Sequence, residues 1–345
     1  MNEIKRIDEL DVLKGIGILL MIFDHCYGWG QEVFAHSIIQ SFHMPLFFIV
    51  SGYLWNSKDN IKDFVQHKIR KILLPHFNFA IIYSLVFVGL YVFGRNTGLE
   101  TLKSIFAIFV FPTRSDLTMF ASPIWFLQAL FLVEVVFTIL KEKAPKLLGL
   151  IISVIAVFGI IYSASFSFML PFALEPFSTG ILFFYLGFML KNADWIKLRG
   201  RKYWLLIPAI LIWTGMILLN GCVDMRSARY YNPILYIANG VMGTIIFLNI
   251  SCLVSTGCMR LKNILRYFSV YSITYLCIHY IFVYYGRIVL CGMSPLSNIV
   301  IGSILFVSGI LICWLLNKFI MKYIPWIVGR SKGRKRCKTG KTDSV

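Results

Sequence analysis

The chain has 345 residues, of which 58% are hydrophobic and 14% are charged, and its mean hydropathy is +0.74. A water-soluble domain has about 45–50% apolar and about 25% charged residues, so this composition excludes an ordinary soluble protein. The formal net charge of +18 is compatible with a nucleic-acid-binding protein and also with a membrane protein that has basic cytoplasmic loops. The distribution of the charges along the chain favours the membrane protein, and no nucleic-acid partner is expected.

Ten predominantly apolar stretches follow one another along the chain, each near the length of about 20 residues that a helix needs to cross a bilayer. They cover residues 12–30, 37–55, 76–94, 122–140, 147–165, 175–191, 203–219, 233–255, 270–290 and 296–320. Lipid offers no hydrogen-bond partners to the backbone, so each stretch is predicted to be a helix. The fold class is therefore predicted to be all-α, a polytopic transmembrane helical bundle of about ten spans. The apolar segment 99–112 is shorter and contains Lys103, which indicates an interfacial or re-entrant piece.

The positive charges alternate along the chain. If the N-terminus is inside, most Lys and Arg residues fall in the inside loops and in the C-terminal tail, which is the positive-inside pattern. This arrangement predicts that both termini lie in the cytoplasm. We expect one transmembrane domain over residues 1–325 and a disordered basic tail over residues 326–345, which lies on anionic lipid headgroups.

The eight Cys residues form no CxxC pair, so neither a zinc site nor a redox motif is predicted, and no metal is expected. Most of them fall within the apolar stretches, where a free Cys behaves as a small packing residue.

The first apolar stretch carries three ionisable residues, Lys14, Asp24 and His25, and Asp11 lies at its start. Lys14 and His25 are eleven residues apart, so on a helix they share one face and lie about 16 Å apart along the axis. Asp24 points about 100° away from its neighbour His25, which disfavours it as the direct partner of that ring. Ionisable groups inside a membrane are costly and usually face a polar interior. The alternative is a Lys whose amine extends to the interface and an interfacial His.

Other polar residues lie at or near the expected membrane boundaries. His43 begins the second span, and as an isolated residue it is as compatible with an interfacial role as with a functional one. His279, Glu134 and Glu175 are each compatible with a structural hydrogen-bonding role, and Arg226 lies in a charge-poor outer loop. The basic pair Arg70 and Lys71 precedes the third span, where it serves either topology or the binding of a phosphate-bearing cofactor.

Several motifs, in order along nearly the whole chain, resemble those of the acyltransferase-3 family of integral membrane acyltransferases, particularly its sugar O-acetylase branch. They are DVLKGIGI at 11–18 with Asp24-His25, FHMPLFF at 42–48, RKILLP at 70–75, IWFL at 124–127, YLG at 185–187, and SITYL at 272–276 with His279. The first two are fairly specific as a pair, and the later ones are weak alone.

The resemblance implies transfer of an acyl group, usually acetyl from acetyl-CoA, to a hydroxyl of a cell-surface polysaccharide or its lipid-linked precursor. It implies a multi-pass protein of the bacterial inner membrane, whose partners are an acyl-CoA donor, a glycan acceptor and membrane lipid. Acetyl-CoA is the donor substrate, no metal is implied, and the oligomeric state is not predicted. The candidate residues are His25, His43 and Asp24 for catalysis, Lys14, Arg70 and Lys71 for the donor, and Trp125, Arg226 and His279 for the acceptor.

Two other functions remain open from the residues alone. A transporter or flippase for a small molecule or a lipid-linked sugar also combines about ten helices with polar groups in the membrane. The chain has no evident internal repeat and no pair of helices broken by Gly or Pro, which weighs against a transporter. A non-catalytic scaffold is disfavoured by the charged face of the first helix, because such charges are costly unless they are used.

Overall fold

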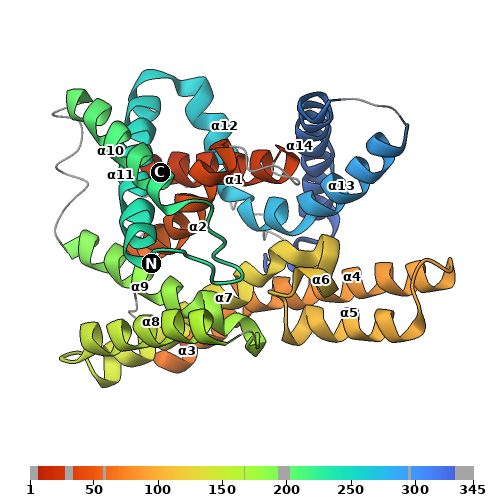
Figure 1. Ribbon diagram of the computed structural model, residues 1–345, viewed down its shortest axis with the longest axis horizontal. Coiled ribbons are helices and arrows are strands. Elements are labelled where there is room, and N and C mark those ends of the chain that lie inside the picture. Colours follow the sequence, from red (N-terminus) through yellow and green to blue (C-terminus); the bar gives the residue numbers. More distant parts are fainter. Residues whose placement is uncertain are drawn as a thin grey trace, which may run out of the picture.

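The computed structural model describes residues 7–27, 34–56, 60–166, 168–192, 203–293 and 297–330. Over these residues the chain is a bundle of helices with a single isolated β-bridge in a loop (Figure 1). The all-α fold is confirmed. The α-helices are α1 (Asp8–Tyr27), α2 (Phe34–Leu54), α3 (Ile61–Lys68), α4 (Leu74–Val92), α5 (Gly98–Val110), α6 (Ser115–Thr118), α7 (Trp125–Lys143), α8 (Leu148–Ser165), α9 (Leu174–Asn192), α10 (Leu206–Asn220), α11 (Pro233–Gly257), α12 (Met259–Val270), α13 (Ser272–Met293) and α14 (Asn298–Tyr323).

Eight of the ten predicted spans are helices long and apolar enough to cross a membrane, within the part of the chain that is described. They contain α2, α4, α7, α8, α9, α11, α13 and α14. The other two predicted spans also form helices. However, α1 carries Asp11, Lys14 and Asp24 in its apolar stretch, and α10 has only 15 residues. Whether these two cross the bilayer therefore stays a prediction.

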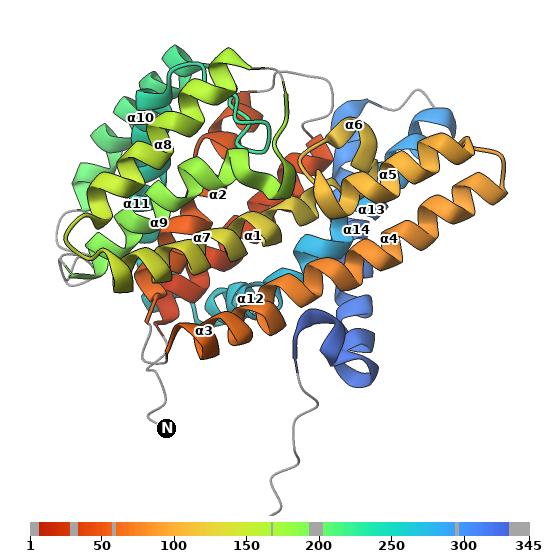
Figure 2. The ribbon, with the colours of Figure 1, turned by 90° about the horizontal axis from the view of Figure 1, so that it is seen from below.

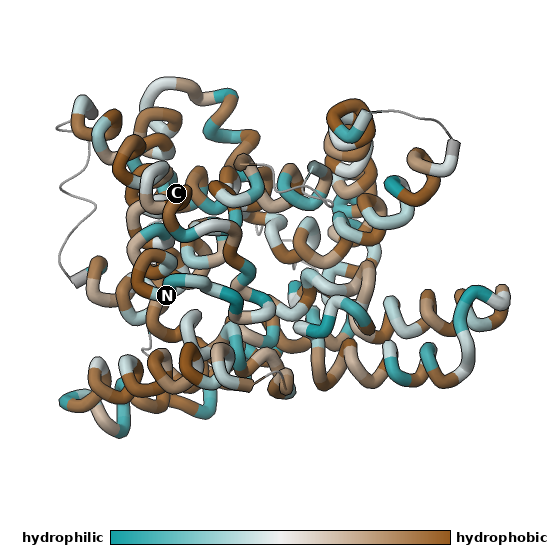
Figure 3. The backbone as a smooth tube through the Cα atoms, in the orientation of Figure 1, coloured by the Kyte–Doolittle hydropathy of each residue, from teal (hydrophilic) through white to brown (hydrophobic). Residues whose placement is uncertain are grey.

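Helix α1 lies in the middle of the bundle, where it packs against α2, α11, α12, α13 and α14. This position explains how its charges are tolerated, because protein rather than lipid surrounds them. Asp11 accepts a hydrogen bond from Ser269 of α12 at 3.0 Å and lies 3.3 Å from the amine of Lys14. By contrast, most of α8 and α14 is exposed, as expected for lipid-facing helices. Figure 3 shows hydrophobic residues along these outer helices and hydrophilic ones at helix ends and in the centre.

Close helix contacts depend on glycine at the crossing of α2 and α9. A Cβ atom on Gly52 would lie 1.9 Å from the carbonyl oxygen of Phe184, and one on Gly187 would lie 2.0 Å from that of Ile49. Each glycine thus lets the backbone of the opposite helix approach. Small residues serve this purpose widely in membrane helices, because close packing and not the hydrophobic effect drives their association.

The segment predicted to be interfacial or re-entrant forms the 13-residue helix α5, which lies beside α4 in both views (Figures 1 and 2). It is too short to span a bilayer, at about 20 Å for 13 residues. The chain then passes through α6 and the 3₁₀ helix η2 (Met119–Ile124) before α7 begins. Residues 120–124 are buried, so this irregular segment is surrounded by protein.

Two helices at one end of the bundle were not predicted. Helix α3 continues into the π-helical turn η1 (Ile69–Leu73), and Lys68 pairs with the buried Glu134 of α7 at 2.5 Å. The amphipathic helix α12 packs along α1, where Lys262 pairs with Asp8. Both helices lie at the lower end of the bundle in Figure 2. Glu175 has a structural role as well, because it accepts a hydrogen bond from the backbone of Leu170.

The first residues of the predicted tail are ordered and lie at this same end. Residues 325–328 form the 3₁₀ helix η6 (Pro325–Val328), and Asn78 of α4 donates a hydrogen bond to the carbonyl oxygen of Ile327 at 3.0 Å. Arg330 donates to the carbonyl oxygen of Val270. The remainder of the tail, residues 331–345, lies outside the described residues. The start of α1 and the end of the described chain therefore lie at the same end of the bundle.

Candidate active site

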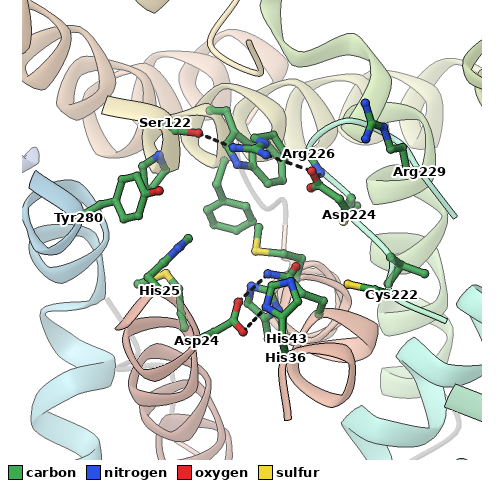
Figure 4. A pocket seen from close by; sticks show the side chains of 18 of the residues that line it. Asp24, His25, His36, His43, Ser122, Cys222, Asp224, Arg226, Arg229 and Tyr280 are labelled. Atoms are coloured by element: carbon green, nitrogen blue, oxygen red, sulfur yellow. Dashed lines mark hydrogen bonds and ion pairs between the residues drawn. The ribbon is translucent and has the colours of Figure 1, made fainter. Parts of the chain in front are cut away.

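A cavity of about 620 Å³ lies at the other end of the bundle (Figure 4). The elements around it are the end of α1, the first half of α2, η2 with the start of α7, the loop 221–232 and the middle of α13. Its volume is within the range of about 300–1,000 Å³ that is usual for small-molecule sites. The predicted site residues Asp24, His25, His43, Trp125 and Arg226 all line it.

The last turn of α1 contributes His25 and Asp24. The ring of His25 faces the cavity and contacts the rings of His279 and Tyr280 on α13, with centroid distances of 5.1 and 4.6 Å. Asp24 is buried and does not serve His25, because both of its oxygens are occupied from α2. His36 Nδ1 lies 2.6 Å from one oxygen, and Gln40 donates to the other at 2.6 Å. The expectation that Asp24 turns away from His25 is confirmed.

Helix α2 presents His36, Gln40 and His43 to the cavity at positions i, i+4 and i+7, which lie on one helix face. His43 is buried, and its Nδ1 donates to the carbonyl oxygen of Ile39 at 2.8 Å. This bond fixes the tautomer in the neutral ring and leaves Nε2 as the atom that can accept a proton. His36 carries an ion pair with Asp24, which stabilises its protonated form.

The loop 221–232 forms one wall of the cavity, and it contains an antiparallel bridge between Asp224 and Arg229. Arg226 spans the cavity wall, donating to Ser122 Oγ of η2 at 2.8 Å and to Asp224 Oδ2 at 3.0 Å. Partial burial alone would raise the pKa of the Asp224 carboxyl. The charge of Arg226 and hydrogen bonds from Ser227 and Arg226 outweigh this effect and hold that pKa below its usual value. Asp224 therefore remains ionised and keeps Arg226 in place.

The segment η2 and the start of α7 form the wall opposite α2. Trp125 and Ser122 line the cavity there. The 3₁₀ backbone before Trp125 is held by His76 of α4, whose Nδ1 donates to the carbonyl oxygen of Ile124 at 3.2 Å. Gln128, one turn further along α7, lies 2.8 Å from His76 Nε2 and donates to the carbonyl oxygen of Phe109 at 2.9 Å. These hydrogen bonds satisfy backbone carbonyl groups of irregular segments in the apolar interior, and they fix the position of Trp125.

His279 lies behind His25 and does not line the cavity. It is fully buried, and its Nδ1 donates to the carbonyl oxygen of Tyr275 at 2.7 Å. Its Nε2 has no hydrogen-bond partner among the described residues. A direct contact between His279 and an acceptor in the cavity is not supported by this position. Its contact with the His25 ring makes it a neighbour of the catalytic candidate.

The three predicted donor-binding residues lie away from the cavity, none of them among its lining residues. Arg70 and Lys71 are exposed on η1, and Lys14 pairs with Asp11 on the first half of α1. The end of the bundle that carries them also holds α3 and α12 (Figure 2). The described chain thus has a basic end and a histidine-lined end.

Sequence reasoning missed several residues of the cavity, chiefly His36, Gln40, Asp224, Ser122 and Tyr280. A signal for the first two is present in the sequence, because His36, Gln40 and His43 have helical i, i+4 and i+7 spacing. The other residues come from a loop, from a 3₁₀ segment and from α13, and no local pattern links them.

Burial, charge and volume suit this cavity for a reaction on a small polar group. It combines imidazoles that can exchange protons, the guanidinium of Arg226 that can bind an oxygen, and aromatic side chains of Trp125 and Tyr280. The imidazoles of His25 and His36 can each accept a proton during a reaction. The carboxylate of Asp24 stabilises the protonated form of the His36 ring.

The chain matches the model of an acyltransferase domain family over residues 7–318. No match was found among curated proteins or among solved structures. The matched region contains every element that lines the cavity as well as the basic end of the bundle. The helical membrane fold, the histidine-lined cavity and a family match over nearly the whole chain lead to one conclusion: the chain belongs to the acyltransferase-3 family and is a multi-pass membrane acyltransferase.

Proposed function

We propose that this protein is an O-acetyltransferase that moves acetyl from acetyl-CoA to a hydroxyl of a cell-surface polysaccharide or of its lipid-linked precursor, in the bacterial inner membrane. The observation that carries the proposal is the position of His25 in the cavity, at the opposite end of the bundle from Arg70 and Lys71. If the termini are cytoplasmic, the basic end faces the compartment that contains acetyl-CoA. The cavity then faces the acceptor outside.

His25 is the proposed base. A hydroxyl is a weak nucleophile near neutral pH, and a positioned imidazole that accepts its proton during attack on a thioester contributes about 10²–10⁴ in rate. The His25 ring faces the cavity and is not tied to Asp24, so it is available for a proton from the acceptor. His43 exposes its cavity edge on the neighbouring helix and is placed to orient the same hydroxyl.

The acceptor is proposed to bind between Trp125 and Arg226. Aromatic faces pack against the apolar faces of sugar rings, and a guanidinium donates to ring hydroxyls or to a carboxylate. Arg226 is fixed by Asp224 and Ser122, so it presents its donors without a large loss of side-chain entropy. Arg70, Lys71 and Lys14 are proposed to hold the phosphates of the donor, whose acyl arm would then have to reach into the bundle.

The test is mass spectrometry of surface glycans from cells that lack the protein, compared with the same cells that carry it on a plasmid. We expect the glycan repeat to lose the mass of an acetyl group in the deletion and to regain it on complementation. Complementation with His25→Ala should fail even though the variant reaches the membrane. An unchanged glycan in the deletion would contradict the polysaccharide acceptor. Loss of a heavier acyl group would contradict the proposal that acetyl is the group transferred.

A further inference from the structure

The ion pair between Asp24 and His36 has a third ionisable side chain near it. Cys222 lies in the loop 221–232 and lines the same cavity as His36. In Figure 4 the sulfur of Cys222 points from the loop towards the histidines of α2. Cys222 is a free, half-buried cysteine. A carboxylate, an imidazole and a thiol from three separate segments are therefore arranged in series on the cavity wall.

This order of groups matches a general requirement of cysteine chemistry. The thiolate is the nucleophile, and a neighbouring imidazole that takes the thiol proton makes it available near neutral pH. A third group must then hold the imidazole in the correct orientation. Asp24 can do so, because it contacts His36 Nδ1 at 2.6 Å and is itself fixed by Gln40 at 2.6 Å. The described residues thus place a thiol, an imidazole and a carboxylate on one wall of the cavity.

We propose that Cys222 carries the acyl group as a thioester between the acyl donor and the acceptor hydroxyl, with His36 as its base and Asp24 as the positioning residue of His36. This inference rests on the proposed function, because it uses the same donor and acceptor. It adds a covalent intermediate and assigns roles to Cys222 and His36, which lie outside the family motifs described above.

The two half-reactions balance without a further reactant. In the first, His36 takes the Cys222 proton, the thiolate attacks the donor carbonyl, a new S–C bond forms and the S–C bond to CoA breaks. The departing CoA thiolate takes the proton from His36. In the second, the acceptor hydroxyl attacks the Cys222 thioester, and His25 receives the hydroxyl proton. The O–C bond forms, the Cys222 S–C bond breaks, and the proton returns from His25 to the sulfur.

The size and position of the cavity support such a relay. The cavity is about 620 Å³, and Lys14, Arg70 and Lys71 are not among its lining residues. With a covalent intermediate, the acyl arm of the donor can leave before the acceptor enters, so the two substrates need not share this space. Exchange of one thioester for another also conserves the bond type, so the acyl group stays activated for the second step.

The decisive experiment incubates the purified protein with acetyl-CoA labelled in the acetyl group, without acceptor, and maps the label by peptide mass spectrometry. We expect label on the peptide that contains Cys222, and its release when acceptor is added. Cys222→Ala and Cys222→Ser should lose the label and more than about 100-fold of the transfer rate. Cys291→Ala, which removes an exposed cysteine of α13, should keep both. Transfer by Cys222→Ala and Cys222→Ser at the wild-type rate would overturn the proposal.

A second measurement does not depend on the donor. The rate of alkylation by iodoacetamide reports the thiolate at each cysteine, so Cys222 should react faster at pH 7 than the exposed Cys258 and Cys291. His36→Gln should slow Cys222 by about 10-fold and leave the other two unchanged. An unreactive Cys222 would overturn the relay, even in a protein that transfers acetyl. A reactive Cys222 in a protein that transfers no acetyl would instead contradict the proposed function.

Discussion

Asp11, Asp24 and Arg287 each contact a polar partner in the interior. These contacts hold the helices that carry the site in position. Asp24 is held by α2, and Asp11 is held by Lys14 and Ser269. Arg287 of α13 is buried as well. It donates to the carbonyl oxygen of Cys26 at 2.7 Å and to Asn298 at 3.2 Å. A cation here stabilises the C-terminal end of α1, where the carbonyl groups lack helical partners.

Replacement of Arg287 should therefore disturb catalysis through His25, which immediately precedes Cys26. We expect Arg287→Gln to lower kcat by about 10- to 100-fold with little change in KM, because a small shift of a catalytic group is costly. Arg287→Lys keeps the charge and should retain more activity. Steady-state kinetics of both variants provide the check. A change confined to KM would show that Arg287 serves binding rather than the orientation of α1.

The residues of the site could be predicted from the sequence only in part. His25 and His43 stand in motifs, and both line the cavity as expected. His36 was missed because its partner Asp24 lies on another helix. Cys222 was not predicted as a site residue from the sequence. Its neighbour His36 is 186 positions earlier, and no local pattern relates two residues so far apart.

Among the elements, the loop 221–232 is held mainly by charge and the helices mainly by close packing. Asp224 accepts hydrogen bonds from Ser227 and from both the backbone and the side chain of Arg226. The pKa of Asp224 is lowered in the folded loop, so its contribution is fully present above the usual carboxyl range and is lost as the pH falls through the lowered value. The loop should thus remain ordered at mildly acidic pH.

Asp224→Asn should loosen this loop at all pH values, since the amide cannot replace the charge that holds Arg226. We expect faster backbone hydrogen exchange over residues 222–230 and a higher KM for the acceptor, while kcat changes less. The wild-type loop should exchange at the same closed-state level from pH 7 to pH 5, after correction for the intrinsic rate. Loosening of the wild-type loop within that range would contradict the assignment of Asp224.

The crossing of α2 and α9 can be tested with a matched pair of glycines. Gly52→Ala places a methyl group against the backbone of Phe184, and we expect it to destabilise the fold by roughly 1–3 kcal/mol or more. Gly89→Ala in α4 meets no atom within 4 Å and should be neutral or slightly stabilising. Thermal unfolding in detergent compares the two. Equal midpoints would contradict the close approach of α2 and α9.

Helices that consist of a long apolar run could be predicted from the sequence. Helices that depend on tertiary contacts for their stability could not. The long apolar spans α2, α4, α7, α8, α9, α11, α13 and α14 were expected with boundaries close to those observed. Helix α12 was missed because its basic residues give it the composition of a loop, and its packing along α1 supplies the stabilisation. The 3₁₀ segment η2 was placed partly inside a predicted span, because its buried apolar residues resemble helix in composition.

At the scale of the whole molecule, the proposed separation of the donor and acceptor sides depends on which end faces the cytoplasm. Among the cysteines that the structure describes, Cys258 and Cys291 are exposed. They mark opposite ends of the bundle, because Cys258 lies between α11 and α12 and Cys291 lies near the end of α13. With both termini inside, Cys258 is cytoplasmic and Cys291 is external. A membrane-impermeant maleimide applied to intact cells should label Cys291 and should label Cys258 only after lysis. The reverse pattern would place the basic end outside, away from cytoplasmic acetyl-CoA.

The most direct test of the account is acetyl transfer by the purified protein in liposomes, with labelled acetyl-CoA and glycan from cells that lack the protein. We expect the wild type to move the label to the glycan, and His25→Ala to lose about 10²–10⁴ in rate while remaining folded. His67→Ala, which changes an exposed histidine of α3, should transfer at the wild-type rate. Transfer by His25→Ala at the rate of the wild type would contradict the central role of the histidine-lined cavity.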